Sequence, residues 1–250
     1  MAITLINFIK EKVDQKVIKL LIVISCYLVC YFYTIDKLPK NAWIVGAYIA
    51  ISLPILLSFT NNNYVNIGII LIPLVSMFLC TSYTVAIASI GGIIGYFIFE
   101  KEYILCLILM LLLSILFFSL YRHKKIDVVY RLNLWSRSLK KADFTLFGDG
   151  LRLYKNYKFM AGQNTKTTHA HNEFIELYCE LGLIGIMIVA LYIISLFKIH
   201  APNEYKAMLL AILIMCFGYY PLRIPSLGLL TIINIGIINK YKTKRRFANV

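Results

Sequence analysis

The chain has 250 residues, of which 60% are hydrophobic and 15% are charged, and its mean hydropathy is +0.75. These values lie outside the usual range of soluble domains and exclude a soluble globular protein. They predict an all-α polytopic membrane protein. The formal net charge of +14 does not by itself identify a partner.

Apolar runs bounded by polar breaks predict the membrane spans, because about 20 apolar residues of helix cross a bilayer core. About eight transmembrane helices are expected, at residues 17–35, 42–59, 64–81, 83–99, 103–121, 173–197, 206–220 and 225–239. The first is interpreted as a retained span, since no small-residue cleavage site follows it before residues 36–40. A tight re-entry at Ser82 separates the third run from the fourth, because one helix through both would overrun the bilayer.

Basic residues in the short flanks predict the orientation of these spans. Twelve Lys or Arg lie on the side of the two termini, and the opposite short flanks hold only Lys37, Lys40 and Arg223. The positive-inside rule therefore places both termini in the cytoplasm. The predicted organisation is five transmembrane helices in residues 1–121, a large basic periplasmic loop in residues 122–172, and three transmembrane helices with a basic cytoplasmic tail in residues 173–250.

The loop 122–172 carries eleven Lys or Arg against three Asp. Two interpretations stay open: the loop is solvated beside anionic headgroups, or it binds a polyanion such as a pyrophosphate, whose oxygens suit Arg and Lys. Nucleic acid is not an expected partner of a loop on the outer face. Within the loop, Gly148 and Gly150 suit either an ordinary turn or a close backbone approach to a ligand.

The end of this loop and the start of the next span carry the strongest motif, at residues 167–185. Asn172 is a good helix N-cap, which places His171 just outside the first turn. A helix amino terminus attracts phosphate, and a histidine there is a candidate general base. The alternative for such a histidine is a surface or capping position. His169 is either a second proton acceptor or a structural neighbour.

Three glutamates follow, and their spacing puts Glu173, Glu176 and Glu180 on one helix face. Glu180 lies about 12 Å along the helix, where an ionisable group normally faces a polar cavity or a partner. We expect Glu180 to face inward and to pair with Arg131 or another loop cation. An interfacial position is expected for Glu173 and stays open for Glu176. Gly182 and Gly185 then form a small face for close helix packing.

The six cysteines all fall within or at the ends of apolar runs, where a thiol behaves as a small hydrophobe. No disulfide framework, metal site or cofactor is expected.

Order and spacing of these motifs are similar to a known family. His171-Asn172, nine intervening residues, Gly182, two more residues and Gly185 resemble the signature of the O-antigen ligase and O-antigen polymerase superfamily. Arg131 ahead of Trp135, and the Leu-Phe-Gly-Asp-Gly run at residues 146–150, agree with it. The resemblance covers about residues 80–200. It implies a bacterial inner-membrane protein of lipopolysaccharide biosynthesis, with residues 122–172 as its large periplasmic loop.

The activity that the resemblance implies is transfer of a glycan from undecaprenyl pyrophosphate to a sugar hydroxyl, without a metal. The acceptor would be the lipid A core in a ligase, or a second lipid-linked repeat unit in a polymerase, and the sequence does not separate the two. His171 would activate or position the acceptor hydroxyl, and Arg131 would stabilise the departing pyrophosphate. The further expected substrate contacts are Arg137, Lys141, Gly148, Gly150, His169, Asn172 and Glu180.

Two features depart from the family pattern. Residues 81–84 lack the arginine that relatives often carry at the corresponding turn, so Arg137 or Lys141 would have to replace it. Relatives commonly have ten or more spans, which makes this chain a compact member or one without the amino-terminal helices. Both departures favour an alternative, a non-catalytic or flippase-like protein that binds lipid-linked glycan. The presence of His171, Arg131 and Glu180 favours the transferase.

Overall fold

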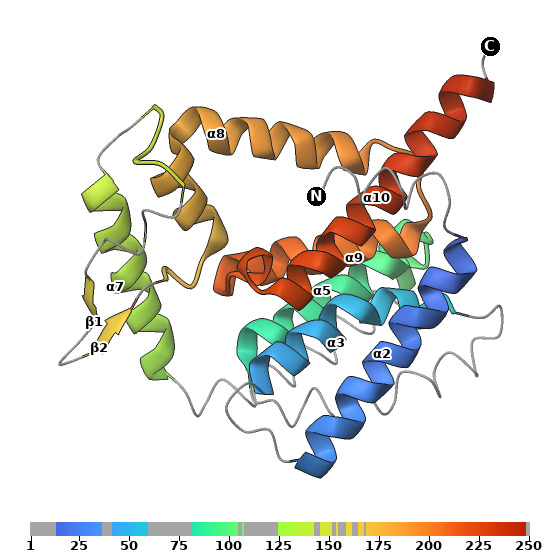
Figure 1. The fold of residues 1–250 in the computed structure, drawn as a ribbon, viewed down its shortest axis with the longest axis horizontal. Coiled ribbons are helices and arrows are strands. Elements are labelled where there is room, and N and C mark those ends of the chain that lie inside the picture. The colour runs from blue at the N-terminus through green and yellow to red at the C-terminus, as the bar shows by residue number, and fades with distance from the viewer. Residues whose placement is uncertain are drawn as a thin grey trace. The chain divides into compact units, whose positions relative to one another are not determined.

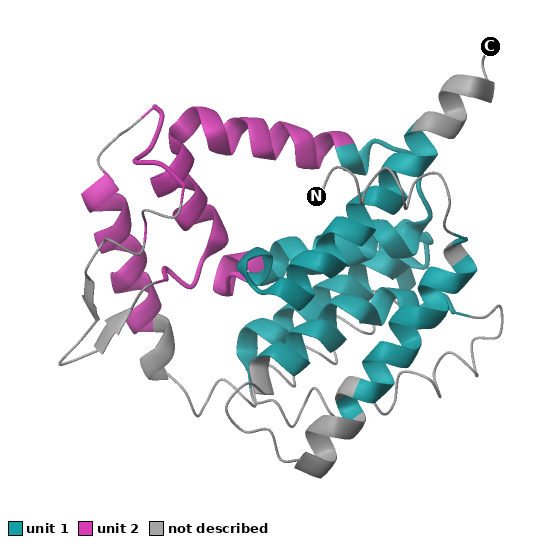
Figure 2. Cartoon of the chain, viewed as in Figure 1, with its two compact units in different colours: residues 1–110, 196–215, 221–250 teal, residues 111–195, 216–220 magenta. Residues whose placement is uncertain are grey.

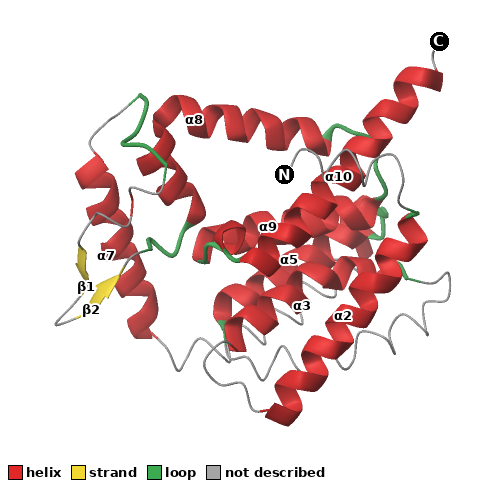
Figure 3. Ribbon diagram, in the orientation of Figure 1, coloured by secondary structure: helices red, strands yellow, loops and turns green. Residues whose placement is uncertain are grey.

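The computed structural model describes residues 14–36, 42–59, 82–104, 107, 125–142, 146–151, 154, 159–161, 165–167 and 169–248. In these ranges it contains seven α-helices, one 3₁₀ turn and one two-stranded antiparallel hairpin (Figures 1 and 3). The chain divides into two compact units (Figure 2). Unit 1 comprises residues 1–110, 196–215 and 221–250, and unit 2 comprises residues 111–195 and 216–220.

Unit 1 is a helix bundle. Its elements are α2 (Gln15–Asp36), α3 (Ala42–Leu57), α5 (Tyr83–Phe99), most of α9 (Asn203–Gly218), η3 (Pro221–Arg223) and α10 (Pro225–Ala248). Helix α3 packs against both α2 and α5 (Figure 1). Small residues permit the close approach of these helices: a Cβ atom at Gly92 of α5 would lie 3.0 Å from the Cβ of Ala211 in α9 and 3.3 Å from the side chain of Pro54 in α3.

Polar contacts gather at one end of this bundle. Lys19 Nζ lies 2.7 Å from a Glu204 carboxylate oxygen and donates to the backbone and hydroxyl oxygens of Ser58. The Asn203 side chain donates to the carbonyl of Phe99 over 3.0 Å. The start of α2, the end of α3, the end of α5 and the start of α9 therefore meet. Successive crossings in opposite directions would produce this arrangement, and the side of the membrane on which it lies stays a prediction.

Six of the eight predicted runs coincide, within a few residues, with α2, α3, α5, α8, α9 and α10, except that α10 continues through the basic tail to Ala248. By length and composition, one described helix could cross a membrane, α8 (Glu173–Phe197), and Ile44–Leu57 and Tyr83–Phe99 are shorter apolar helices. The run 64–81 and nearly all of the run 103–121 lie outside the described residues. The total of eight spans therefore stays a prediction.

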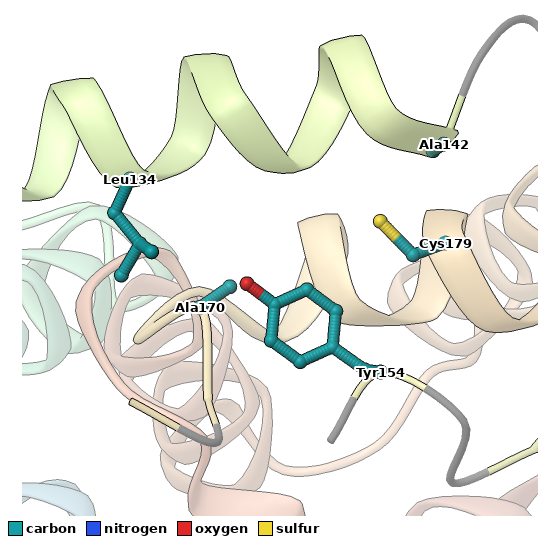
Figure 4. Close-up of a cluster of buried hydrophobic side chains, with 5 residues drawn as sticks. All are labelled: Leu134, Ala142, Tyr154, Ala170 and Cys179. Atoms are coloured by element: carbon teal, nitrogen blue, oxygen red, sulfur yellow. The ribbon is translucent and has the colours of Figure 1, made fainter. Parts of the chain in front are cut away.

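Unit 2 shows that the predicted loop contains secondary structure. It holds an 18-residue helix, α7 (Lys125–Ala142), and a hairpin in which β1 (Phe159–Ala161) pairs antiparallel with β2 (Thr165–Thr167). One side of α7 packs inward: Leu134 and Ala142 form a buried cluster with Tyr154, Ala170 and Cys179 (Figure 4). The Ser138 hydroxyl, also buried, lies 2.7 Å from the Tyr154 hydroxyl. This cluster fastens α7 to the first half of α8.

Helix α8 is broken at Gly182, which has φ +70° and ψ −170°. Residues 146–150 dock onto the break and satisfy its backbone groups: Asp149 N–H donates to Cys179 O (2.9 Å), Gly150 N–H donates to Glu180 O (3.0 Å), and Ile184 N–H donates to Leu146 O (3.1 Å). A broken helix beside lipid requires such partners.

The two glycines at this contact have no room for a side chain. A Cβ atom at Gly182 would lie 2.4 Å from Leu146 O, and one at Gly148 would lie 2.5 Å from Gly182 N. The expectation that Gly182 and Gly185 form one packing face is therefore wrong: Gly182 breaks the helix, and Gly185 accommodates the Leu181 side chain. Gly148 does make a close backbone approach, and the group that it approaches is the backbone of α8.

The break predicts a specific sensitivity to Gly182→Ala. An alanine in this glycine-specific backbone region costs about 1–3 kcal/mol, and the clash with the Leu146 carbonyl adds to this cost. We expect the thermal unfolding midpoint of the purified protein to fall by several degrees. Ile184→Ala, which shortens an exposed side chain beyond the break, is the control and should leave the midpoint unchanged. An unchanged midpoint for Gly182→Ala would contradict this backbone geometry.

Candidate functional site

The segment that carries the predicted histidines is held from both sides. Ala170 is fully buried; its N–H donates to a Glu176 carboxylate oxygen over 2.7 Å, and its carbonyl accepts the Trp135 indole N–H over 2.9 Å. His171 follows with φ +52°, a left-handed conformation that costs energy in a residue with a side chain. The contacts of Ala170 to α7 and α8 hold His171 in this strained position.

Glu176, in the first turn of α8, has a buried side chain that contacts the residues just before the helix. Its side chain is fully buried, and its second carboxylate oxygen lies 3.4 Å from Nδ1 of His169. The His169 ring stacks on Tyr220 with centroids 4.2 Å apart and an interplanar angle of 18°. Glu173 is also buried. The expectation that Glu173 is interfacial is therefore wrong, because its side chain is buried within the protein, as that of Glu176 is.

Asn172 caps α8, as the sequence predicts. Its side-chain oxygen accepts the N–H groups of Phe174 and Ile175 over 3.0 and 3.1 Å, and its carbonyl accepts that of Glu176. The N–H of Glu173 donates to the carbonyl of Tyr219 over 3.2 Å. All four N–H groups of the first turn are therefore paired within the protein. The expectation that this helix terminus binds a phosphate stays a prediction.

Arg131 reaches the end of α9 from α7. Its Nη1 donates to the carbonyl of Gly218 over 2.9 Å, and its guanidinium lies 5.2 Å from the ring centroid of Tyr219, within cation–π range. The His171 ring contacts the same Tyr219 edge-on at 6.4 Å, and Tyr220 at 5.5 Å. Arg131 and His171, which are far apart in the sequence, thus both contact the ring of Tyr219.

The environment of His171 keeps its imidazole neutral. Burial, the positive charge of Arg131 and the neighbouring His169 together lower the pKa of His171 to about 4, while Glu176 opposes them. Nδ1 of His171 is buried and has no hydrogen-bond partner among the described residues. A neutral imidazole with an unused nitrogen can accept a proton. The Arg131 guanidinium close by can stabilise negative charge.

The sequence model of the O-antigen ligase family matches residues 17–190. The chain belongs to the O-antigen ligase family. Members are bacterial membrane proteins that transfer glycan in lipopolysaccharide biosynthesis and use lipid-linked glycan substrates. Family membership confirms the resemblance drawn from residues 131–185. Comparison with curated proteins and with solved structures gives no match.

In the structure of this O-antigen ligase family member, only some of the other predicted substrate contacts lie near His171. His169 and Asn172 lie beside His171, and Glu180 is buried on the same helix face; its pairing with Arg131 stays a prediction. Arg137 and Lys141 are exposed on α7. Gly148 and Gly150 contact the break in α8. Among the described residues, no three His, Cys, Asp or Glu are grouped to hold a metal ion.

Sequence reasoning missed three parts of the site: Tyr219, Tyr220 and the buried role of Glu176. The Tyr-Tyr pair directly before Pro221 was a usable signal, because tyrosines gather at membrane interfaces. The burial of Glu176 had no local signal, since it depends on the fold of residues 169–172.

Glu176 acts as a positioning residue, and two substitutions test this role. Glu176→Ala removes the acceptor of the Ala170 N–H, and a buried unpaired donor costs about 1–3 kcal/mol. We expect glycan transfer to fall about tenfold or more, because the segment that positions His171 loses this contact and a small misplacement of a reacting group slows a reaction strongly. Glu176→Gln keeps an acceptor and should retain most activity at equal protein level. Equal loss in both variants would show that the charge, and not the hydrogen bonds, is required.

Proposed function

We propose that this protein transfers a glycan from undecaprenyl pyrophosphate to a sugar hydroxyl, with His171 as the general base and Arg131 as the group that stabilises the leaving pyrophosphate. The observation that carries the proposal is the neutral, half-buried imidazole of His171 beside the Arg131 guanidinium, both in contact with Tyr219. Family membership supports the class of reaction.

The proposed step is a displacement at the anomeric carbon of the donor sugar. The acceptor hydroxyl oxygen forms the new bond while its proton passes to His171. The bond from the anomeric carbon to the pyrophosphate oxygen breaks, and undecaprenyl pyrophosphate leaves with the electron pair. Arg131 stabilises the negative charge that develops on that oxygen, which is effective where water is excluded. General-base catalysis of this kind contributes about 10²–10⁴-fold.

The acceptor is either the lipid A core or a second lipid-linked repeat unit, as in the ligase and polymerase branches of the superfamily. The alternative function, a flippase-like carrier of lipid-linked glycan, would not require a general base. The neutral state of His171 therefore favours the transferase over the carrier.

His171→Ala and Arg131→Ala, expressed in a strain that lacks the native gene, test the proposal. Each should abolish polymer transfer and cause periplasmic lipid-linked units to accumulate, while the protein remains in the membrane. His200→Ala, at an exposed histidine after α8, is the matched control and should keep the full glycan ladder.

The ladder also identifies the acceptor. Loss of all polymer from lipid A indicates a ligase, whereas a single repeat unit left on the core indicates a polymerase. Retention of units on the cytoplasmic leaflet would indicate a flippase and overturn the proposal, as would full activity in both variants.

The lowered pKa of His171 predicts the pH dependence of transfer. The base works only when unprotonated, so activity should fall as the pH drops through about 4, and not through the ordinary histidine value near 6.5. Arg131 disfavours the protonated imidazole, so its removal raises the pKa of His171. In the Arg131→Gln variant, the pH at which the remaining kcat/KM falls on acidification should therefore be higher. A wild-type acid limb near 6.5, or no movement in the variant, would contradict this assignment.

A further inference from the structure

The outer surface of α7 combines an apolar stripe with a cationic one. Val129, Leu132 and Leu139 are 59%, 53% and 46% exposed, and at about 100° per residue they fall within an arc of roughly 80°. Lys140, Arg137 and Lys141 are exposed along the adjoining arc. The buried side of α7, which carries Leu134 and Ser138, faces the interior of unit 2. A helix with these two exposed stripes is typical of a membrane interface.

The loop after α7 adds further exposed apolar side chains. Phe147 is 75% exposed, and Leu146 and Leu151 are also exposed. The backbone of this loop is fixed by its hydrogen bonds to the break in α8, so these side chains are held outward. An exposed group of large apolar residues normally marks a contact surface.

The second half of α8, in the same unit, indicates which partner covers this surface. It exposes Met187, Ile188 and Leu191, as expected of a span whose side faces lipid. In Figure 1, α7 lies across the direction in which this half of α8 runs. If α8 crosses the bilayer, α7 therefore lies along the membrane surface, on the side where α8 begins.

We propose that α7 lies in the headgroup layer of the bilayer and binds anionic phospholipid. Val129, Leu132 and Leu139 insert among the acyl chains, as Phe147 does from the loop, and Arg137, Lys140 and Lys141 contact lipid phosphates. Lysine and arginine beside a membrane are attracted to the negative surface of anionic lipids. This assignment gives Arg137 and Lys141 a role outside the Arg131–His171 site and does not depend on the proposed chemistry.

Tryptophan fluorescence in the full-length protein tests the proposal. The chain has two tryptophans, and Trp43→Phe leaves Trp135 as a constant background. Into this background are placed Leu132→Trp, on the apolar stripe, and Asn133→Trp, its exposed neighbour turned about 100° around the helix. Each protein is placed in phosphatidylcholine bilayers, with and without phosphatidylglycerol, made with lipids brominated on their acyl chains.

We expect several-fold more bromolipid quenching of the tryptophan at position 132 than of that at position 133, and more quenching in bilayers that contain phosphatidylglycerol. Val129→Trp repeats the measurement if Leu132→Trp does not accumulate. Quenching at position 132 by aqueous iodide alone would show an aqueous surface. Protection from both quenchers would show a protein contact. Equal quenching with and without phosphatidylglycerol would remove the anionic-lipid requirement. Each of these three results overturns the proposal.

Discussion

Backbone groups exposed at helix ends and breaks must find hydrogen-bond partners when they lie in or beside a bilayer. In unit 2 that requirement determines which segments meet. The break at Gly182 is completed by residues 146–150, and the start of α8 is completed by Asn172 and the carbonyl of Tyr219. The carbonyl of Gly218 is taken by Arg131. Main-chain hydrogen bonds thereby join α8 to residues 146–150 and to Tyr219.

The same pairing explains how the proposed general base, His171, and the proposed leaving-group cation, Arg131, come together. The contacts of α7 and of the end of α9 with the first turn of α8 bring Arg131 over the Tyr219 ring and His171 edge-on to it. Burial and the guanidinium favour the neutral form of His171, while the carboxylate of Glu176 accepts the N–H of Ala170, the residue before His171. In the proposed mechanism, Arg131 thus provides positive charge for the leaving group without protonation of the base.

Some of this architecture could be predicted from the sequence. Apolar runs located the described helices of unit 1, and the preference of asparagine for N-caps located the start of α8. Helix α7 was not predicted, although Val129, Leu132 and Leu139 have helical spacing, because the surrounding loop is strongly polar. The break at Gly182 was missed because a glycine in an apolar run equally suits close packing. Only a partner backbone 34 residues upstream shows the difference.

Only part of the candidate site could be predicted from the sequence. The roles of Arg131 and His171 came from family resemblance, since the spacing of 40 residues between them carries no distance information. Tyr219 and Tyr220 lie about 50 residues further on, and their contribution depends on tertiary contacts. Residues whose function rests on local geometry, such as Asn172, could be identified, whereas the shared aromatic surface could not.

A double-mutant cycle on kcat/KM tests most directly whether Arg131 and His171 act as one unit. Two conservative variants in which we expect slow but measurable turnover in vitro, Arg131→Lys and His171→Gln, are compared singly and together with purified protein and a lipid-linked donor. Residues that stabilise the same transition state have strongly non-additive effects. The account predicts that the double variant is about as slow as the slower single variant. A double variant whose loss equals the product of the two single losses would contradict it.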